Sequence, residues 1–448
     1  MIVGISGYVG NRLTGIGRVL IAVVADLAKL YPKDTYVIFK NFDFKEYDSI
    51  LHFPNVKIVD VPYTKESTAK NILWHQWTFQ KLLRKYKCDL AYIPNFTLLL
   101  WKVRPTIVTI HDLIEYNVPD KFSKVRMLYR KTVCDPLMAR RSDHILTVSK
   151  SSYNDIIKYL AVKPEKITLT LNATDKNFFR KYSREEVESA IVEYNLGYKE
   201  YLLFVGTIDY PGKNIKTVIE AFFNLRTQGK LEGKKLVIIG KDGFNSKVIY
   251  DFVDASSFKN EVVFTGYLKD EDLPKYYAGA SIMLYLSFFE GFGLPVLEAM
   301  SCGTPVICSN TSCFPEIVEE LDVMVDPKDV KGVEDKIERI ILDGQYSLKL
   351  AEKCYEKSLK YSWEETAKYI MKHSQKCVRK RMMEEKKLNA FIETFRCYPW
   401  LNVCNCLLEF PQILKSQTGV SNTIIKIYGR KETKWYSDCD ISLQCSLL

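Results

Sequence analysis

The stretch SFFEGFGLPVLEAMSCGTPVICSN, from Ser287 to Asn310, contains the order of elements that decides the fold. It follows directly on the apolar run SIMLYLS (281–287), which predicts a strand. A loop with two glycines comes next, and Pro295 fits the first turn of a helix. The run TPVICS (304–309) then predicts another strand. Strand, loop, helix and strand in this order are typical of a parallel sheet covered by helices.

The same alternation extends over most of the chain. Helical patterns separate the predicted strands, for example at 19–30, 71–87 and from residues 214, 273 and 295 onward. Two series of strands, divided near residues 172–200, predict an α/β protein with two doubly wound, Rossmann-like domains. The predicted strands are MIVGIS, TYVIFK, DLAYIP, TIVTIH and HILTVS in the first series, and YLLFVG, KLVIIG, EVVFTG, SIMLYLS and TPVICS in the second.

These patterns divide the chain into four parts. We expect an N-terminal domain at 1–175 and a C-terminal domain at 176–362. A helix at 363–380 is expected to pack back on the N-terminal domain. Residues 381–448 have no alternation of strands and helices, and no function is assigned to them.

The composition is that of a globular protein. The 448 residues are 47% hydrophobic and 26% charged, and no apolar run reaches the ~20 residues needed to span a bilayer. The opening MIVGISGYVG does not have the pattern of a secretory signal, so we expect a cytoplasmic protein. The 12 cysteines have no regular spacing, which favours free thiols over disulfides or a zinc site.

The positive charge lies in the N-terminal part. Residues 1–180 hold 28 lysines and arginines but only 16 acidic residues, whereas the whole chain has a net charge of +10. This asymmetry favours an anionic partner, either a phosphate-bearing substrate or an anionic membrane surface. No nucleic-acid-binding motif accompanies it, so a nucleic-acid partner is not expected.

The loop after the SIMLYLS strand has the residues of a ligand site. Glu290 lies at the end of the strand and Glu298 lies inside the following helix. Carboxylates can accept two hydrogen bonds from vicinal hydroxyls, and the backbone amides from Gly291 to Leu294 can donate to a phosphate. One glutamate can therefore hold a hexose and the other a ribose. The alternative is that Glu298 caps its helix and Glu290 is a solvated loop residue.

Three further motifs are candidates for the same site. In TGIGR, Gly15 and Gly17 permit a close approach to phosphate, although Leu20 stands where a dinucleotide fingerprint needs its third glycine. FVGTIDYPGKN places Lys213 beside a helix start, but its spacing does not fit a kinase-type phosphate loop. His111 in TIHDLIEY ends a predicted strand, where open α/β sheets bind ligands. A tight turn, a solvated lysine and a structural histidine are the alternatives.

The acidic run DED at 270–272 precedes a helical pattern. Acidic residues favour a helix N-terminus, and this is the role that we expect for the run.

The string EGFGLPVLEAMSCGTPVICSN, with FPEIV after it, resembles the donor-site signature of retaining glycosyltransferase family 4, the group 1 glycosyltransferases. The hallmark of this family is a pair of glutamates with seven residues between them, here Glu290 and Glu298. The resemblance covers roughly residues 1–380. Further similar motifs, in family order, are TGIGR, TIHDL, DHILTVSKSSYNDI, LNATDKNFF, FVGTIDYPGKN, LVIIGKDG and VVFTGYLKDEDLPKYYAGASI.

The resemblance implies the GT-B fold, in which two Rossmann-like domains face each other across a cleft. It implies a nucleotide-diphosphate sugar as co-substrate, with no cofactor and no essential metal. The N-terminal domain would bind the acceptor and the C-terminal domain the donor.

By the same resemblance, Glu298 would bind the donor ribose and Glu290 the hexose. Lys213 and the amides of Phe292, Gly293 and Leu294 would hold the diphosphate. The other residues assigned to the donor site are Gly15, Gly17, Gly206 and Gly291. His111 would lie near the sugar and, with Glu290 and Lys213, is assigned a catalytic role.

One departure from the family pattern concerns the diphosphate. Family members usually carry an arginine in the first loop of the second domain, but this chain has Thr207 and Gly212 at those places. Arg18 or Lys241 could replace it, or donor binding is weak.

The expected function is that of a hexosyltransferase in polysaccharide biosynthesis, with a glycan or lipid-linked acceptor and GDP-mannose as the first donor to test. A UDP-sugar-dependent transferase of the same fold is one alternative, and a catalytically weak homologue that acts as a binding subunit is the other. TLLLWKVRP (97–105) and the basic segment from Lys121 to Arg141 suit docking onto the inner face of the cell membrane.

Overall fold

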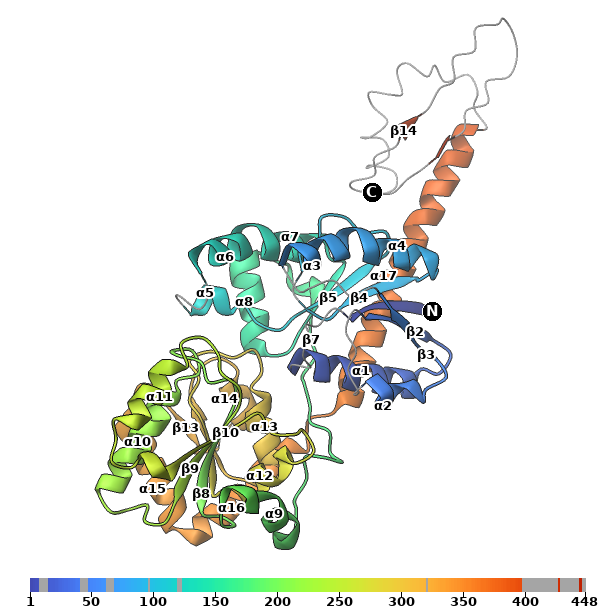
Figure 1. The fold of residues 1–448 in the computed structure, drawn as a ribbon. Helices are drawn as coiled ribbons and strands as arrows, with labels where there is room; N and C mark the ends of the chain where they lie inside the picture. The colour runs from blue at the N-terminus through green and yellow to red at the C-terminus, as the bar shows by residue number, and fades with distance from the viewer. Residues whose placement is uncertain are drawn as a thin grey trace, which may run out of the picture.

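The computed structural model describes residues 1–7, 15–40, 47–61, 68–95, 97–118, 123–319 and 321–396, together with two short strands at 426–427 and 443–444. Figure 1 shows two bodies, each a sheet flanked by helices, with the N-terminus in the upper one. The long helix α17 (Trp363–Arg396), drawn in orange, returns from the lower body to the upper one.

Seven parallel strands form the sheet of the N-terminal body, in the order β3-β2-β1-β4-β5-β6-β7. The order reverses between β1 and β4, and ligands of open α/β sheets bind beside such a reversal. β4, β5 and β6 are buried along their whole length, as in a sheet covered on both faces. The strands are β1 (Ile2–Gly7), β2 (Thr35–Lys40), β3 (Val56–Asp60), β4 (Leu90–Ile93), β5 (Thr106–Ile110), β6 (His144–Thr147) and β7 (Ile167–Leu169).

Helices cover both faces of this sheet. The pattern at 71–87 predicts one helix, and the structure forms it from two α-helices joined by a π-helical turn at Trp74–Thr78. A second such turn at Arg130–Cys134 joins α6 to α7. The helices are α1 (Gly15–Leu30), α2 (Asp48–Leu51), α3 (Thr68–Leu73), α4 (Phe79–Lys85), α5 (Ile114–Asn117), α6 (Lys124–Tyr129), α7 (Asp135–Arg141) and α8 (Lys150–Leu160), with a 3-10 turn at Pro164–Lys166.

The C-terminal body repeats the plan with six parallel strands in the order β10-β9-β8-β11-β12-β13. They are β8 (Tyr201–Val205), β9 (Lys235–Ile239), β10 (Val262–Gly266), β11 (Ile282–Tyr285), β12 (Val306–Ser309) and β13 (Met324–Val325). The helices are α9 (Arg184–Ile191), α10 (Ile215–Thr227), α11 (Lys247–Asp254), α12 (Leu273–Gly279), α13 (Leu294–Ser301), α14 (Phe314–Val318), α15 (Val330–Leu342) and α16 (Gly344–Ser358), with 3-10 turns at Val192–Tyr194 and Lys259–Glu261.

All ten predicted strands are present, and the two doubly wound sheets confirm the predicted fold class. The sequence patterns missed β3, β7 and β13, which are three of the four outer strands of the two sheets. These strands are only partly buried, so they do not show the continuous apolar runs of the inner strands.

Helix α17 completes the core of the N-terminal body. Its buried side chains Ala367, Ile370 and Met371 pack in one cluster with Val23 and Val24 of α1.

The helix runs to Arg396, beyond the predicted end at residue 380. Two antiparallel strands, β14 (Lys426–Ile427) and β15 (Leu443–Gln444), are the other described parts of the chain after it. The rest of the segment 381–448 lies outside the described residues.

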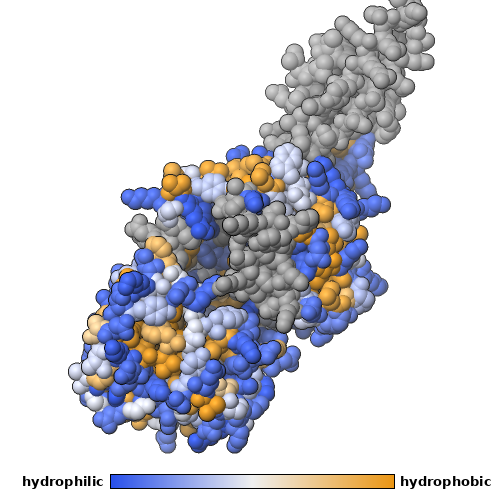
Figure 2. Space-filling view, in the orientation of Figure 1, coloured by the Kyte–Doolittle hydropathy of each residue, from blue (hydrophilic) through white to orange (hydrophobic). Residues whose placement is uncertain are grey.

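Apolar side chains are exposed on the upper side of the N-terminal body. Helix α6 has no buried residue, and its Val125 and Leu128 are 80% and 64% exposed. Figure 2 shows orange side chains among blue ones along this edge, where Figure 1 places α3, α6 and α7. We call this the α6 surface and define it by its exposed apolar residues Leu73, Trp77, Leu100, Val125, Leu128 and Val133.

No helix in the described ranges combines the length and the apolar character needed to span a bilayer. Seven cysteines among the described residues have free thiols: Cys88, Cys134, Cys302, Cys308, Cys313, Cys354 and Cys377.

The packing of α17 on α1 predicts a strong effect at one methionine. Met371→Ala should lower the free energy of unfolding by about 2–5 kcal/mol, because Met371 is 2% exposed and its loss leaves a cavity. Met383→Ala, on the same helix but 61% exposed, is the matched control and should stay within about 0.5 kcal/mol of wild type. Urea unfolding of both variants measures the difference. Equal effects would contradict the packing of α17 on the N-terminal core.

Candidate active site

The loop between β11 and α13 has a backbone that only glycine suits at two places. Gly293 has φ of +83°, and a Cβ atom there would lie 2.8 Å from the ring of Phe314. A Cβ atom at Gly291 would lie 2.5 Å from the carbonyl oxygen of His111 in the other body. Helix α13 begins at Leu294, one residue before the predicted start, with Pro295 in its first turn.

The amides of this loop are available for a ligand. The amide of Glu290 donates to the hydroxyl of Ser312, but the amides of Gly291, Phe292, Gly293 and Leu294 donate to no other residue in the described part of the chain. They surround the N-terminus of α13, where the partial positive charge of the helix favours an anion.

Lys213 and Glu290 form an ion pair in the C-terminal body. The Nζ atom of Lys213 lies 2.5 Å from Oε1 of Glu290 and 3.0 Å from the hydroxyl oxygen of Tyr285. That hydroxyl is itself 3.2 Å from Glu290 Oε1, so the three side chains form a closed triangle. Gly206 lies beside it, since a Cβ atom there would be 3.7 Å from the ring of Tyr285.

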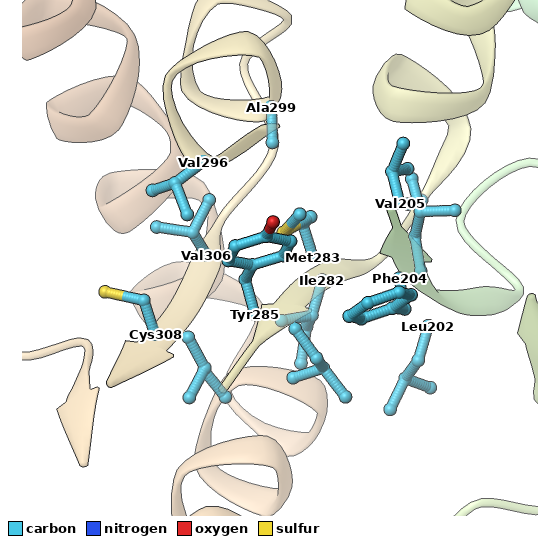
Figure 3. Close-up of a cluster of buried hydrophobic side chains, with 14 of the residues drawn as sticks. Leu202, Phe204, Val205, Ile282, Met283, Tyr285, Val296, Ala299, Val306 and Cys308 are labelled. Atoms are coloured by element: carbon cyan, nitrogen blue, oxygen red, sulfur yellow. The ribbon is translucent and has the colours of Figure 1, made fainter. Parts of the chain in front are cut away.

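The hydrophobic core of the C-terminal body holds Tyr285, and through it the Lys213–Glu290 pair, in place. Tyr285 is 1% exposed and stacks on Phe204 at 5.6 Å between ring centroids. Figure 3 shows its ring within the apolar cluster formed by β8, β11, β12 and α13. Burial works to lower the pKa of Lys213, but the carboxylate of Glu290 outweighs it and raises that pKa well above its ordinary value. The amine therefore remains protonated at neutral pH.

Glu298 occupies the other end of the site. It is 7% exposed, and its Oε2 atom accepts a hydrogen bond from the hydroxyl of Tyr277 at 2.8 Å. Its Oε1 atom lies 3.9 Å from the guanidinium of Arg18, which comes from α1 of the N-terminal body. Burial raises the pKa of Glu298, and Arg18 and Tyr277 work against this rise.

Arg18 also pairs with Asp270, the first acid of the DED run. Asp272 is the N-cap residue of α12 but makes no side-chain capping bond. The helix-start role expected for this run is therefore wrong for Asp270, which lies in an ion pair between the two bodies. The sequence could not indicate this contact because the partners are 252 residues apart.

His111 lies at the end of β5, and its backbone faces the glycine loop. Its side chain points to the N-terminal body, where Nε2 donates to the carbonyl of Pro94 at 2.8 Å. Burial lowers the pKa of His111, which favours the neutral ring with Nδ1 as an acceptor. Burial also raises the pKa of the neighbouring Asp112 to about 6.

The two glycines of TGIGR lie on different sides of α1. Gly15 begins this helix, and a Cβ atom there would be 4.0 Å from the side chain of Leu294. The starts of α1 and α13 thus face each other across the two bodies. Gly17 is buried with the core-facing residues of α1. Thr14 lies outside the described residues.

The structure therefore brings Lys213, Glu290 and Gly206 together, with Glu298 one helix turn beyond the amides and Gly15 opposite them.

Sequence reasoning missed Tyr277, Tyr285, Ser312 and Asp270. The hydroxyl of Ser312 both accepts from the amide of Glu290 at 3.1 Å and donates to its carbonyl at 2.6 Å. For Tyr277, Tyr285 and Ser312 the only signal was a polar residue next to an apolar strand or helix, which does not distinguish them from ordinary surface residues. Asp270 was noticed only as part of the DED run.

No group of three or more His, Cys, Asp or Glu side chains that could hold a metal ion occurs among the described residues. The site offers one partly buried ammonium, a row of amides and two carboxylates. This set can bind a polyhydroxylated ligand that carries phosphate in its middle.

Two family profiles match the chain. "Glycosyl transferases group 1" matches residues 189–360, which contain Lys213, Glu290 and Glu298. "Glycosyltransferase Family 4" matches residues 14–178, which contain His111.

Two curated relatives come from Escherichia coli. O-antigen chain mannosyltransferase B is 32% identical over 283 residues, which are 63% of this chain and 73% of that protein. The serotype-specific mannosyltransferase WbdA is 27% identical over 60% of this chain but only 32% of its own length.

A solved structure shares the whole two-domain arrangement. The Anabaena protein Alr3699/HepE, in complex with UDP and glucose, has a TM-score of 0.65 at 17% identity and covers 83% of this chain and 99% of its own. Both family profiles thus match one family, and the fold matches over 83% of this chain. The chain belongs to the group 1 glycosyltransferases of family 4 and has the GT-B fold.

Proposed function

We propose that this glycosyltransferase transfers a hexose, with retention of anomeric configuration, from a nucleotide-diphosphate sugar to a hydroxyl of a glycan or lipid-linked acceptor in polysaccharide biosynthesis. The observation that carries the proposal is the Lys213–Glu290 pair at one end of the amide-bearing loop, with Glu298 at the other. GDP-mannose is the first donor to test, because two relatives are named as mannosyltransferases.

The ribose end of the donor is assigned to Glu298. One of its oxygens already accepts from Tyr277, while the other is 3.9 Å from Arg18. A carboxylate has about four acceptor positions, so two remain for the ribose hydroxyls.

The diphosphate is assigned to Lys213 and the amides before α13. A protonated amine has three N–H donors, and Glu290 and Tyr285 accept two of them. The third can donate to a phosphate oxygen without breaking the pair with Glu290. Fixed donors aimed at the departing diphosphate are worth more in a buried site than in water.

In the proposed step the bond between the anomeric carbon and the diphosphate oxygen breaks, and the acceptor oxygen forms the new bond on the same face of the sugar. The acceptor proton passes to an oxygen of the departing diphosphate, so the protein need not supply a covalent nucleophile. Glu290 would hold the hexose hydroxyls during this exchange. Metal-independent turnover is part of the proposal, and activity that persists in EDTA would support it.

Of Arg18 and Lys241, Arg18 is the better candidate to replace the arginine that family members usually place at the diphosphate. It lies at the start of α1, on the side of the site that faces Glu298, and Asp270 and Glu298 raise its pKa although burial works against them. Lys241 follows β9, and its carbonyl pairs with the loop backbone at Ile208. We therefore assign the supporting charge to Arg18.

Two alternatives remain. A UDP-sugar donor is favoured by the complex of the Anabaena protein with UDP and glucose. A catalytically weak binding subunit is favoured by Thr207 and Gly212, which stand where the family usually has an arginine.

We also propose that the α6 surface docks on an anionic membrane, where a lipid-linked acceptor would be found. Its exposed valine and leucine on α6 alternate with the exposed cations Lys124 and Arg126. Nearby, Trp77 packs edge-on against Trp101 at 5.7 Å between ring centroids, and Arg84 lies over the Trp101 ring. Apolar and aromatic side chains among cations are typical of helices that lie in a membrane interface.

A donor panel tests the proposed reaction and separates the alternatives. GDP-mannose should raise the melting temperature of the protein and be hydrolysed or transferred, because a ligand that binds only the native state stabilises it. A larger shift with UDP-glucose or another UDP-sugar would replace the mannose assignment. No turnover and no binding for any donor would favour the binding subunit.

The leaving-group role predicts the effect of one substitution. Lys213→Ala should lower kcat by about 100-fold or more, because it removes a donor that stabilises the departing diphosphate. Lys216→Ala, in the first turn of helix α10 that follows Lys213, is the matched control and should keep near wild-type activity, since its amine lies over the ring of Phe252 instead. Steady-state kinetics measures both variants. Full activity of the Lys213 variant would show that the assignment is wrong.

The α6 surface predicts vesicle binding. Wild-type protein should float with liposomes that contain anionic lipid and not with neutral ones. Replacing Val125 and Leu128 by Ser should weaken this binding at least about tenfold, since each buries apolar area in the interface. The control replaces Leu342 and Leu348, two exposed leucines of the C-terminal body, by Ser. Flotation of the α6 variant equal to wild type would contradict the assignment.

A further inference from the structure

Glu316 lies in α14 of the donor domain, outside the residues assigned to the donor, and it makes a contact with the acceptor domain that the proposed reaction has not used. Its two carboxylate oxygens accept the backbone amides of Lys150 and Ser151, both at 2.7 Å. These amides belong to the first turn of α8, and they are separated from Glu316 by 166 and 165 residues.

The contact satisfies donors that α8 cannot satisfy itself. The first amides of a helix have no partner within the helix. In α8 the N-cap residue Ser149 accepts the amide of Ser152 at 3.1 Å, and Glu316 accepts the two amides before it. A carboxylate at a helix N-terminus is also favoured by the partial positive charge there. The donor domain thus caps a helix of the acceptor domain.

In both domains, further hydrogen bonds connect this helix cap to residues of the active site. On the donor side, Ser312 lies four residues before Glu316 and holds the backbone of Glu290 through two hydrogen bonds. On the acceptor side, the hydroxyl of Ser152 in the first turn of α8 donates to the carbonyl of His111 at 2.8 Å. That carbonyl is the atom that a side chain at Gly291 would meet.

These contacts connect the two domains beside the active site. In the donor domain, Ser312 and Glu316 link Glu290 to α8. In the acceptor domain, Ser152 of α8 binds His111, whose carbonyl faces Gly291. Glu316 also lines a cavity of about 490 Å³ together with residues of both domains, among them Ser149 and Phe292. The carboxylate can thus leave α8 without disrupting a packed core.

We propose that Glu316 is a positioning residue that holds the two domains closed and thereby sets Glu290 of the donor site against His111 of the acceptor domain. This inference rests on the proposed function for its effect on catalysis, but the contact itself can be tested without turnover.

Amide hydrogen exchange at single-residue resolution tests the contact. In Glu316→Ala the amides of Lys150 and Ser151 should exchange about tenfold faster or more, because a hydrogen bond to a charged acceptor is lost. The amide of Ser152 should not change, since Ser149 still accepts it. The control is Glu319→Ala, whose carboxylate pairs with Lys357 and Lys360 of its own domain. Unchanged exchange at Lys150 and Ser151 would overturn the proposal.

Kinetics separates positioning from a general loss of structure. Glu316→Ala should lower kcat about tenfold or more while the donor KM and the melting temperature stay close to wild type, because the donor contacts lie within the other segments of its domain. Glu316→Gln, which keeps the size and one acceptor oxygen, should recover part of the rate. Equal losses in kcat, donor affinity and melting temperature would show a merely structural role. If the wild type turns over no donor, the proposed function fails, yet the exchange result still decides whether Glu316 holds α8.

Discussion

The ion pair between Lys213 and Glu290 is the interaction on which the site depends. The side chains of Lys213 and Glu290 are 21% and 17% exposed, so both charges lose much of their hydration. Only good geometry compensates for that loss. Here Tyr285 supplies a hydroxyl to both partners, while its ring is fixed in the core of the C-terminal sheet. The sheet therefore sets the position of the ammonium, and the ammonium sets the position of the acid. A charged group that is held in this way needs little reorganisation when a ligand binds.

Much of the fold could be predicted from the sequence because the inner strands of a parallel sheet must be apolar on both faces. The same reason explains what was missed, since β3, β7 and β13 are outer strands that are only partly buried. Helix α17 was predicted to end early because the residues just beyond 380, RMMEEKK at 381–387, include five charged ones, and a charged run gives no periodic apolar signal.

The candidate site divides in a similar way. Glu290, Glu298 and Lys213 stand next to glycine loops at strand ends, so local order and resemblance were enough to single them out. Tyr277 and Asp270 act on Glu298 and Arg18 through tertiary contacts. Partners of this kind cannot be found from one sequence, because the distance along the chain carries no information about which helices will face each other.

Helix α17 has a consequence for the order in which the protein can be made. The core of the N-terminal body includes Ile370 and Met371, which leave the ribosome only after the whole C-terminal body has been synthesised. At about 5–20 residues per second, the roughly 200 residues between β7 and these side chains take on the order of ten to forty seconds. During that time the apolar face of α1 has no partner from α17. The core of the body that is translated first can therefore be completed only after the second body has been made.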